Sequence, residues 1–499
     1  MALTPGGSLN SVPASRKQTL NTNYLDFTSG ANDWAQQYLP DLMEKEAEVF
    51  GPRTISGFLS QVGAEESMTS DQVIWSEQSR LHLSYTGTAQ PAGDVNGTIT
   101  ILADIDGDTT VGATASRTHG IRVNDMLLIA QAGVVVKALA VETPDSNVVS
   151  VEPYATAALS TLSAAACTIL VIGSEFGKGA SYADETGTFK ADGRGANEPT
   201  FKSFNNKPII MKDYYEISGS DVSRIGWVEV ASEDGASGYM WYLKAEADTR
   251  SRFNDHLEMT MLEAEKTAAA SIIGFGANSQ VRGAADAGLN GAGTEGLFAA
   301  IESRGNITSG VTGVNAATDL AEFDAILAEF DNQGAIEENM MFVNRATSLA
   351  MDDMLASMNS YGAGGTSYGV FNNSEDMALN LGFSGFRRGS YDFYKSDMRY
   401  LNDKATRGGI NDAAGSAAIR GIIVPAGTST VYDQMLGKNL KRPFLHVRYR
   451  ASQTDDRKMK TWVTGSVGAA TSALDAMQIH MLSERCLVTQ GANNFMLMK

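Results

Sequence analysis

The sequence is poor in cysteine and in long apolar runs, and each shortage excludes a class of protein. Its 499 residues include two cysteines, Cys167 and Cys486, which lie far apart and belong to no Cys-x-x-Cys or Cys/His pattern. A disulfide framework and a structural zinc site are therefore not expected, and we expect both thiols to be buried. There is no run of about 18 apolar residues and no apolar segment typical of a secretory signal near the start. We expect synthesis in the cytoplasm and no membrane association.

Basic residues are also scarce. Lys and Arg number 39 against 58 Asp and Glu, so the formal net charge at pH 7 is −19. A chain this acidic repels a phosphate backbone, which makes it a poor candidate for reading a nucleic-acid sequence. An acidic surface is still compatible with a container whose wall does not adhere to the polymer inside.

Catalytic and cofactor patterns are missing as well. The five histidines are scattered, with no His-Glu-x-x-His pattern, and Gly382–Gly385 lacks the frame of a Gly-x-Ser-x-Gly nucleophile turn. The glycines at 362, 364, 365 and 369 are not followed by Gly-Lys-Ser/Thr, so a phosphate-binding loop is not indicated. We therefore expect no catalytic residue, no cofactor and no metal.

One weak metal pattern is present. Asp104, Asp106 and Asp108 surround Gly107 with part of the spacing of a calcium loop. The bidentate Glu that would close such a loop is missing. An Asp-Gly turn between two strands explains the spacing equally well.

What the sequence does contain is a series of contrasting segments, and its length suggests about three structural units. Residues 1–30, rich in Ser, Thr, Asn and Gly, predict an extended arm that orders only against a neighbour. Residues 33–50 have the spacing of a short amphipathic helix. Residues 86–175 alternate apolar runs with turn residues and predict an all-β module, a small barrel or sandwich. In residues 176–197 glycine and charge replace apolar side chains, which indicates an exposed loop.

The second half of the chain mixes helices with strands, which gives the fold class α+β. Residues 235–270 predict one helix of roughly 50 Å. A possible capping pair of Asp319 and Glu322 predicts the start of another helix, which Gly334 can end. A strand over Met340–Val343, a helix capped by Asn344 and, from residue 421, a return to strands follow.

Several segments carry a resemblance to a known family. Residues 337–355, EENMMFVNRATSLAMDDML, look like a strand that ends at an Asn before a helix; residues 381–398, LGFSGFRRGSYDFYKSDM, are similar to the strand that comes next; and residues 480–497, HMLSERCLVTQGANNFML, resemble a closing strand. In this order they resemble the major capsid proteins of tailed bacteriophages with the Hong Kong 97-like fold. Residues 48–59 and 75–85 look most like those of large phages such as the crAss-like group.

The resemblance implies a division of the chain. It places an N-terminal arm in 1–30, the start of a peripheral lobe and extended loop in 31–85, the inserted β module in 86–175, the return of the extended loop in 176–207, the peripheral lobe with a long spine helix in 208–315, an axial lobe in 316–420, and the rest of the axial lobe with a return to the peripheral lobe in 421–499.

The same resemblance implies a structural protein of the virion head. It would assemble with itself in pentamers and hexamers of an icosahedral shell around double-stranded DNA, without sequence-specific binding, and be assembled in the host cytoplasm. Separate scaffolding, portal and auxiliary head proteins would be its partners. Some members of the family form a Lys to Asn link between subunits; Lys178 and Lys190, in the presumed loop, are the donors to consider here, with no acceptor identified.

Charge is segregated along the chain, which suggests where subunits meet. Residues 437–460 carry eight basic against two acidic side chains, whereas residues 228–265 carry nine acidic against three basic ones. These stretches could pair across subunits or within one, since exposed pairs are worth only about 0 to 1 kcal/mol each. The candidate inter-subunit residues are Lys178, Lys190, Arg194, Arg448, Arg450, Glu246 and Glu258.

Two other functions stay open from the sequence. A tail or baseplate component of a phage would also carry β modules and no catalytic site. An acidic hydrolase with a β appendage would need a concave pocket in which titratable groups converge.

Overall fold

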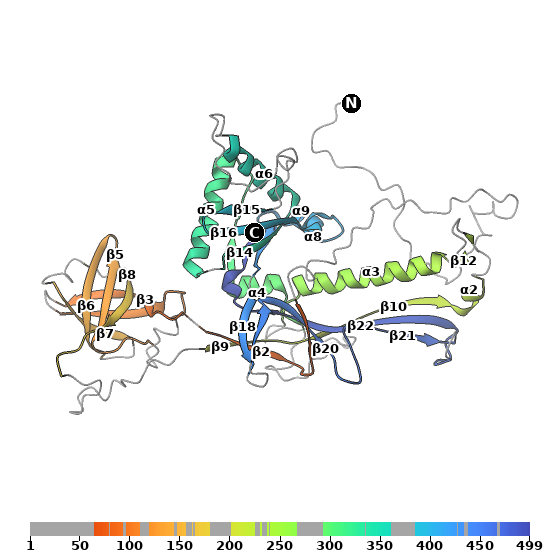
Figure 1. Ribbon diagram of the computed structural model, residues 1–499, viewed down its shortest axis with the longest axis horizontal. Helices are drawn as coiled ribbons and strands as arrows, with labels where there is room; N and C mark the ends of the chain where they lie inside the picture. Colours follow the sequence, from red (N-terminus) through yellow and green to blue (C-terminus); the bar gives the residue numbers. More distant parts are fainter. Residues whose placement is uncertain are drawn as a thin grey trace. The chain divides into compact units, whose positions relative to one another are not determined.

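The computed structural model describes most of the chain from residue 64 onward. The described residues are 64–78, 80–92, 96–109, 119–143, 147–155, 162, 165–179, 201–224, 230–231, 237–238, 240–266, 293–334, 336–360, 385–426, 428–433, 438–466 and 470–499. The arm predicted in 1–30 and the helix predicted in 33–50 lie outside them, as does the Gly-rich run at 362–369. The chain divides into two compact units, one of Met1–Trp75 with Phe204–Lys499 (unit 1) and one of Ser76–Ser203 (unit 2) (Figure 1).

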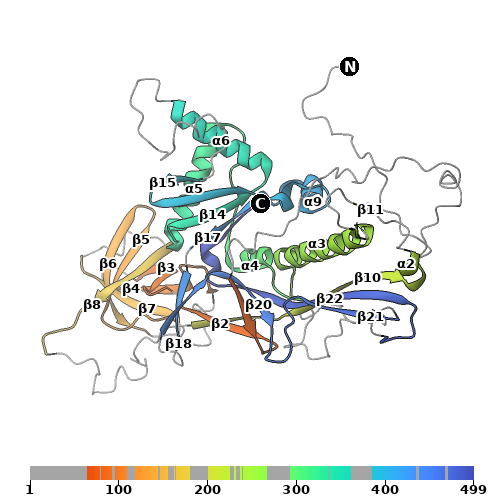
Figure 2. The ribbon, with the colours of Figure 1, turned by 45° about the vertical axis from the view of Figure 1, so that its right-hand side comes forward.

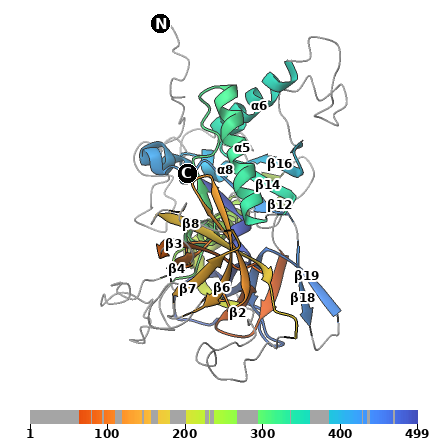
Figure 3. The ribbon, with the colours of Figure 1, turned by 90° about the vertical axis from the view of Figure 1, so that its left-hand side faces the viewer.

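Unit 2 holds a closed barrel in the interval where the sequence predicts an all-β module. Its strands are β3 (Ser84–Ala92), β4 (Asn96–Asp104), β5 (Asp125–Gln131), β6 (Val134–Glu142), β7 (Val148–Pro153) and β8 (Ala166–Ser174). They close in the order β3-β4-β7-β6-β5-β8, with every neighbouring pair antiparallel (Figure 3). Closure leaves the barrel no open sheet edge.

The barrel has a core of its own because its strands alternate. In β5 the buried positions are every second residue, and Leu127 and Ile129 are fully buried inside with Ile99, Ile101 and Ile169. The free thiol of Cys167 is buried in the same core, as predicted.

A glycine permits a bulge in this barrel. The register between β3 and β4 shifts between Thr86 and Gly87, and a Cβ at Gly87 would lie 2.5 Å from the carbonyl oxygen of Thr100. A bulge of this kind bends and twists a strand, which is what closure of a small barrel requires.

A two-stranded ribbon marks the division between the units. β2 (Val73–Gln78) pairs with β9 (Phe201–Asn206), and the division falls within both strands. The chain therefore leaves unit 1 along β2 and re-enters it along β9.

Unit 1 contains a five-stranded sheet with one long helix along it. The sheet has the order β1 (Ala64–Met68), β20 (Leu445–Arg450), β22 (Ala476–Thr489) and β10 (Ile209–Ser218), and β21 (Lys460–Gly465) also pairs with β22. Helix α3 (Met240–Glu263) runs along β10 and β22 (Figures 1 and 2). Phe253 and Leu257 of the helix pack with Met481 of β22.

The predicted helix over 235–270 is wrong at both ends. Ser237–Gly238 form strand β12, which pairs with β11 (Val230–Ala231), and α3 spans 24 residues, roughly 36 Å. The helix ends at Glu263 because the carbonyl of the next residue, Ala264, accepts a hydrogen bond at 2.7 Å from the N–H of Gly296, which lies outside the helix. The apolar spacing marked the helix but not the tertiary contact that stops it.

A second, six-stranded sheet completes unit 1. Its order is β13 (Asn306–Thr308), β23 (Met496–Met498), β17 (Gly421–Pro425), β14 (Glu338–Val343), β16 (Tyr391–Asp397) and β15 (Gly385–Arg388). Helices α5 (Ala316–Gln333) and α6 (Arg345–Ser360) share a core with it, in which Phe323 and Phe330 meet Met351, Phe393 and Ile423. The fold class is α+β, as predicted.

One continuous core joins the two sheets. It contains Leu445 and Leu487 of the five-stranded sheet, Phe342 and Leu497 of the six-stranded sheet, and Phe298 of helix α4 (Leu297–Arg304) between them. The last segment of the chain crosses this core, since β22 belongs to one sheet and β23 to the other. The shorter elements are α2 (Gly219–Arg224), α8 (Arg399–Asn402), α9 (Arg407–Ala414), the hairpin of β18 (Thr428–Asp433) and β19 (Lys438–Pro443), and the 3-10 turns η6 (Gly415–Ala417) and η7 (Ala492–Asn494).

For helices α5 and α6, two of the predicted helix ends agree with the structure and one does not. Gly334 ends α5 in the left-handed conformation, with φ 66°, and the Asn344 side chain accepts from the N–H of Thr347 at the start of α6. The predicted capping pair is wrong, because Asn315 caps α5 by accepting from the N–H of Thr318 at 2.9 Å.

The two acids of that pair have another role. The Asp319 carboxylate accepts from the N–H of Gly313 at 2.8 Å, and the Glu322 carboxylate accepts from the N–H and hydroxyl of Thr312. Both therefore bind the loop before the helix.

Candidate functional site

The weak calcium candidate forms a turn in unit 2. The Asp104 carboxylate accepts from the N–H of Asp108 at 2.7 Å, Gly107 between them has φ +89°, and Arg80 binds the Asp106 carboxylate at 2.8 Å. In the part of the chain that the structure describes, no group of three or more His, Cys, Asp or Glu side chains is placed to hold a metal ion. The three aspartates thus lie on an Asp-Gly turn at the end of β4.

One hollow lined by described residues can be compared with what a hydrolytic site requires. It has a volume of about 350 Å³ and lies beside the start of α6, where its lining includes Asn344, Asp353 and Arg420. Asp353 and Arg420 are the titratable groups in this lining. Such a lining lacks the convergent set of acid, base and nucleophile that hydrolysis needs.

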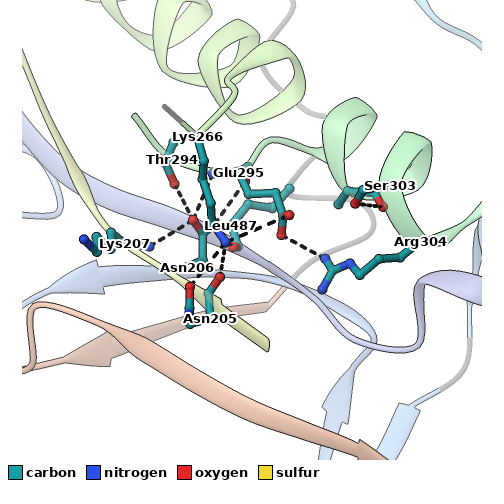
Figure 4. A network of polar contacts seen from close by, with 10 residues as sticks. Asn205, Asn206, Lys207, Lys266, Thr294, Glu295, Ser303, Arg304 and Leu487 are labelled. Atoms are coloured by element: carbon teal, nitrogen blue, oxygen red, sulfur yellow. Dashed lines mark hydrogen bonds and ion pairs between the residues drawn. The ribbon is translucent and has the colours of Figure 1, made fainter. Parts of the chain in front are cut away.

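A network of polar contacts lies where the β2–β9 ribbon joins unit 1 (Figure 4). Asn206, the last residue of β9, is fully buried. Its amide nitrogen donates to the carbonyls of Leu487 at 2.6 Å and Glu295 at 3.0 Å, and its amide oxygen accepts from the N–H of Glu295 and the hydroxyl of Thr294. One side chain thus joins β9, β22 and the segment before α4 with all its hydrogen-bonding groups used.

Charged groups extend this network toward two aromatic rings. The Glu295 carboxylate binds Arg304 at 2.8 Å, and the Arg304 guanidinium lies 4.5 Å from the ring centre of Phe204 and 5.6 Å from that of Trp75. Phe204 belongs to β9 and Trp75 to β2, so Arg304 holds both strands of the ribbon.

Lys266 completes the network. Its ammonium lies 4.0 Å from the Glu295 carboxylate and donates to the Asn205 carbonyl. Burial lowers the pKa of Lys266, while the Glu295 charge opposes that shift. The network holds the end of the ribbon at Asn206, which we call its root, against the rest of unit 1. It could not be predicted from local spacing, because its members come from five separate segments of the chain.

The basic stretch at 437–460 pairs with acidic side chains of the same chain. Arg448 binds Glu66 of β1 at 2.7 Å, and Arg450 and Arg457 share Glu484 of β22 at 2.7 and 2.6 Å. Arg450 also binds Asp71, and Lys458 binds Glu65. An acidic β1 thus lies parallel to a basic β20 at the sheet edge. The role of Arg448 and Arg450 between subunits stays a prediction.

The other candidate contact residues are scattered. Glu246 pairs with Arg250 on α3 at 3.1 Å, whereas Glu258 is buried, with 5% of its surface exposed. Lys178 is exposed in unit 2 beyond β8, and Lys190 and Arg194 lie outside the described residues. Within unit 1 the described candidates divide between two elements, Glu246 and Glu258 on α3 and Arg448 and Arg450 on β20.

One further polar contact was not predicted from the sequence. Glu263, the last residue of α3, accepts from the Tyr400 hydroxyl at 2.8 Å and from Arg407 at 2.9 Å. A second pair, Lys395 with Asp352, is more deeply buried. Neither pair shows in local spacing, because the partners lie more than forty positions apart.

Among the described residues no helix is long and apolar enough to span a membrane. No protein-family model and no curated protein matches the sequence.

The chain is similar to solved structures of phages at low identity. One, from Microbacterium phage Oxtober96, is 10% identical with a TM-score of 0.37, and the alignment covers 95% of this chain and 99% of that one. The asymmetric unit of the bacteriophage PhiM1 mature capsid is 9% identical with a TM-score of 0.37, covering 96% and 98%. The capsid structure of the cyanophage P-SCSP1u is 8% identical with a TM-score of 0.31, covering 64% and 79%. At such identities and TM-scores these similarities support no conclusion about function.

Proposed function

We propose that this chain is the major capsid protein of a tailed bacteriophage, of the Hong Kong 97-like type, and that it acts by repetition in an icosahedral shell. The observation that carries the proposal is the order of its elements. The β2–β9 ribbon and the barrel are followed by the sheet with the long helix α3. The six-stranded sheet with helices α5 and α6 comes next, and of the last strands β22 belongs to the five-stranded sheet and β23 to the six-stranded sheet. The segments of the sequence that resemble the family fall on these elements in the same order.

In this proposal the five-stranded sheet with α3 is the peripheral lobe and the six-stranded sheet is the axial lobe. The chain has no enzymatic activity; its net charge of −19 suits a wall that encloses double-stranded DNA without adhering to it. Copies meet in pentamers and hexamers, with separate scaffolding, portal and auxiliary proteins as partners. The protein belongs to the virion head and is assembled in the host cytoplasm.

The barrel of unit 2 is an inserted module in this proposal. Its first and last strands, β3 and β8, pair with each other, so the module begins and ends at one place and can be added to a loop without altering the rest of the chain. Its role is to decorate the shell or brace neighbouring subunits.

The test is electron microscopy of the full chain, produced alone and together with a scaffolding protein. Rings of five and six copies, or shells, are the expected result. A strictly monomeric protein at high concentration, with no ring or shell in either preparation, contradicts the proposal. Tubes or plates would favour a tail or baseplate component, and release of sugars from a polysaccharide would favour the hydrolase.

A further inference from the structure

The face of the five-stranded sheet opposite α3 carries a row of aromatic side chains. Strand register places Tyr214 of β10 beside His480 of β22, and His480 beside Trp462 of β21. The rings of Tyr214 and His480 are stacked with centres 6.0 Å apart, and those of His480 and Trp462 with centres 5.2 Å apart. We define this row, with Ile210 and Lys212 of β10, as the Trp462 face.

Packing among the described residues does not account for this row. Met211 and Met481, which point to the other side of the sheet, pack against α3. On the Trp462 face, Tyr214 is 56% exposed, Ile210 54% and Trp462 36%. Large apolar groups gathered in one exposed area mark a surface that binds something else.

The edge beside this face is open as well. Among the described strands β21 pairs with β22 alone, and Thr461, Trp462 and Val463 are all exposed. A strand edge with unpaired backbone groups and β-forming side chains is a ready template for another chain, and soluble proteins normally protect such edges. Here no Pro, bulge or inward charge does so within Lys460–Gly465.

The charge of the face indicates which partner it suits. The row beside the aromatic one holds Lys212 and Lys460, and the row on its other side holds Glu216, which accepts from Gln478 at 2.7 Å. On a chain of net charge −19, this area is locally not acidic. Lys460 is paired with Asp455, and Glu216 balances Lys212, so the area is close to neutral. Two copies of an acidic chain repel each other least where such neutral, apolar areas meet.

A nucleic acid is the less suitable occupant. An aromatic row with lysines can stack bases. Lys460, however, is already paired with Asp455 at 2.7 Å, and Glu216 places a carboxylate on the same face.

We propose that the Trp462 face and the β21 edge are a docking surface for a second copy of this chain, with Trp462 as its anchoring side chain. The inference rests on the proposed function, since it says where the copies of an assembling protein meet. Aromatic anchors of this kind dominate the binding energy of an interface.

The test compares three variants of the full chain. Trp462→Ala and Tyr214→Ala remove exposed rings of the face, and Tyr394→Ala removes a ring from the six-stranded sheet whose exposure, 52%, is close to the 56% of Tyr214. Thermal unfolding first checks that each variant is folded, and sedimentation velocity over a concentration series then measures self-association. We expect association to weaken by roughly tenfold or more in the first two and to stay within about twofold of the original chain in the third.

A second measurement does not depend on removing the anchor. Ile210→Cys adds an exposed thiol on the Trp462 face, while both natural thiols are buried and label slowly. We expect maleimide to label this thiol at least roughly tenfold more slowly in assembled particles than in free subunits, as an occluded group does. Equal rates in the two states overturn the inference.

The outcomes separate the inference from the proposed function. If all three variants assemble like the original chain, the docking surface is wrong and the capsid proposal stands. If the original chain neither associates nor forms particles, both fall. If Trp462→Ala abolishes binding to a single-stranded 20-mer of DNA while self-association is unchanged, the face is a nucleic-acid surface and the inference is overturned.

Discussion

Glu263 and Tyr400 connect helices α3 and α8 of unit 1 through a hydrogen bond of 2.8 Å. Glu263 ends the helix that lies on the five-stranded sheet, and Tyr400 belongs to α8, which follows β16 of the six-stranded sheet. Tyr400 is buried, and Arg407 adds an ion pair to the same carboxylate at 2.9 Å. One carboxylate at the end of α3 therefore holds both α8 and α9.

Replacing Glu263 should therefore destabilise unit 1. We expect Glu263→Ala to lower the free energy of unfolding by about 1.5 to 3 kcal/mol, because a buried hydroxyl loses a charged acceptor. Urea unfolding measures the change. Arg250→Ala, which removes an exposed i,i+4 pair from the same helix, is the matched control and should cost less than about 1 kcal/mol. Equal losses in the two variants would contradict the special role of Glu263.

Tyr391 predicts how the protein responds to alkaline pH. Burial, together with its hydrogen bond to the Asp331 carboxylate at 2.7 Å, raises its pKa from 10.0 to about 12. The folded state therefore holds this proton more tightly than the unfolded state. The resulting stability is fully present below pH 10 and is lost as the pH rises toward 12.

The variant Tyr391→Phe isolates this contribution. We expect the free energy of unfolding to fall less steeply between pH 10 and about 12 than in the original chain. The ultraviolet titration of phenolate should also lack one late component. Tyr394→Phe, an exposed neighbour on the same strand, serves as control and should leave the slope unchanged. A slope unchanged in both variants would show that Tyr391 ionises as freely in the folded as in the unfolded chain.

Asn206 is the residue whose loss should cost most at the root of the ribbon. Asn206→Ala leaves the carbonyl of Leu487 and the N–H of Glu295 buried without this partner, and each unsatisfied group costs about 1 to 3 kcal/mol. We expect a loss of about 3 kcal/mol by urea unfolding. The adjacent, exposed Asn205 provides the control: Asn205→Ala should cost under about 0.5 kcal/mol. A comparably small loss in both would refute the network's importance.

These residues show what the sequence could and could not predict. Alternation in β5 and the caps at Gly334 and Asn344 depend on neighbours along the chain, so their patterns are visible in the sequence. The C-terminal end of α3 depends on Gly296, and the role of Glu322 depends on the loop at Thr312, which the fold brings near. The cap of α5 is a local contact that was not predicted from the sequence. Local spacing also predicted the two charged stretches, but it could not say that β1 supplies the acids for the basic one.

The pairing of Arg448 with Glu66 can be separated from a contact between subunits by a charge swap. Arg448→Glu places two carboxylates side by side, so we expect a loss of about 1 to 2 kcal/mol in unfolding free energy and a lower yield of particles. The double variant Glu66→Arg with Arg448→Glu restores the pair within the chain. If Arg448 acts only there, stability and yield both recover.

A different outcome would support the role between subunits. In this outcome the double variant regains stability but does not assemble, and its particle yield depends on salt differently from that of the original chain. This result would show that Arg448 faces another copy. The dependence is informative because the screening length falls from about 10 Å at 0.1 M salt to about 3 Å at 1 M. If Arg448→Glu alone folds and assembles normally at every salt concentration, Arg448 has neither the role within the chain nor the role between subunits.

The barrel of unit 2 should fold without the rest of the chain. It is closed, so no strand lacks a partner, and its core of Ile99, Leu127, Ile129, Ile169 and their neighbours is drawn from residues 85–169 alone. We expect a fragment of Ser76–Ser203 to give a β-type circular dichroism spectrum and a single cooperative unfolding transition. Leu127→Ala, which opens a cavity in that core, should cost about 2 to 5 kcal/mol, whereas Leu102→Ala at a 48% exposed position should cost less than about 1 kcal/mol. A disordered fragment would show that the barrel depends on unit 1, and equal effects of the two substitutions would show that its interior is not packed as a core.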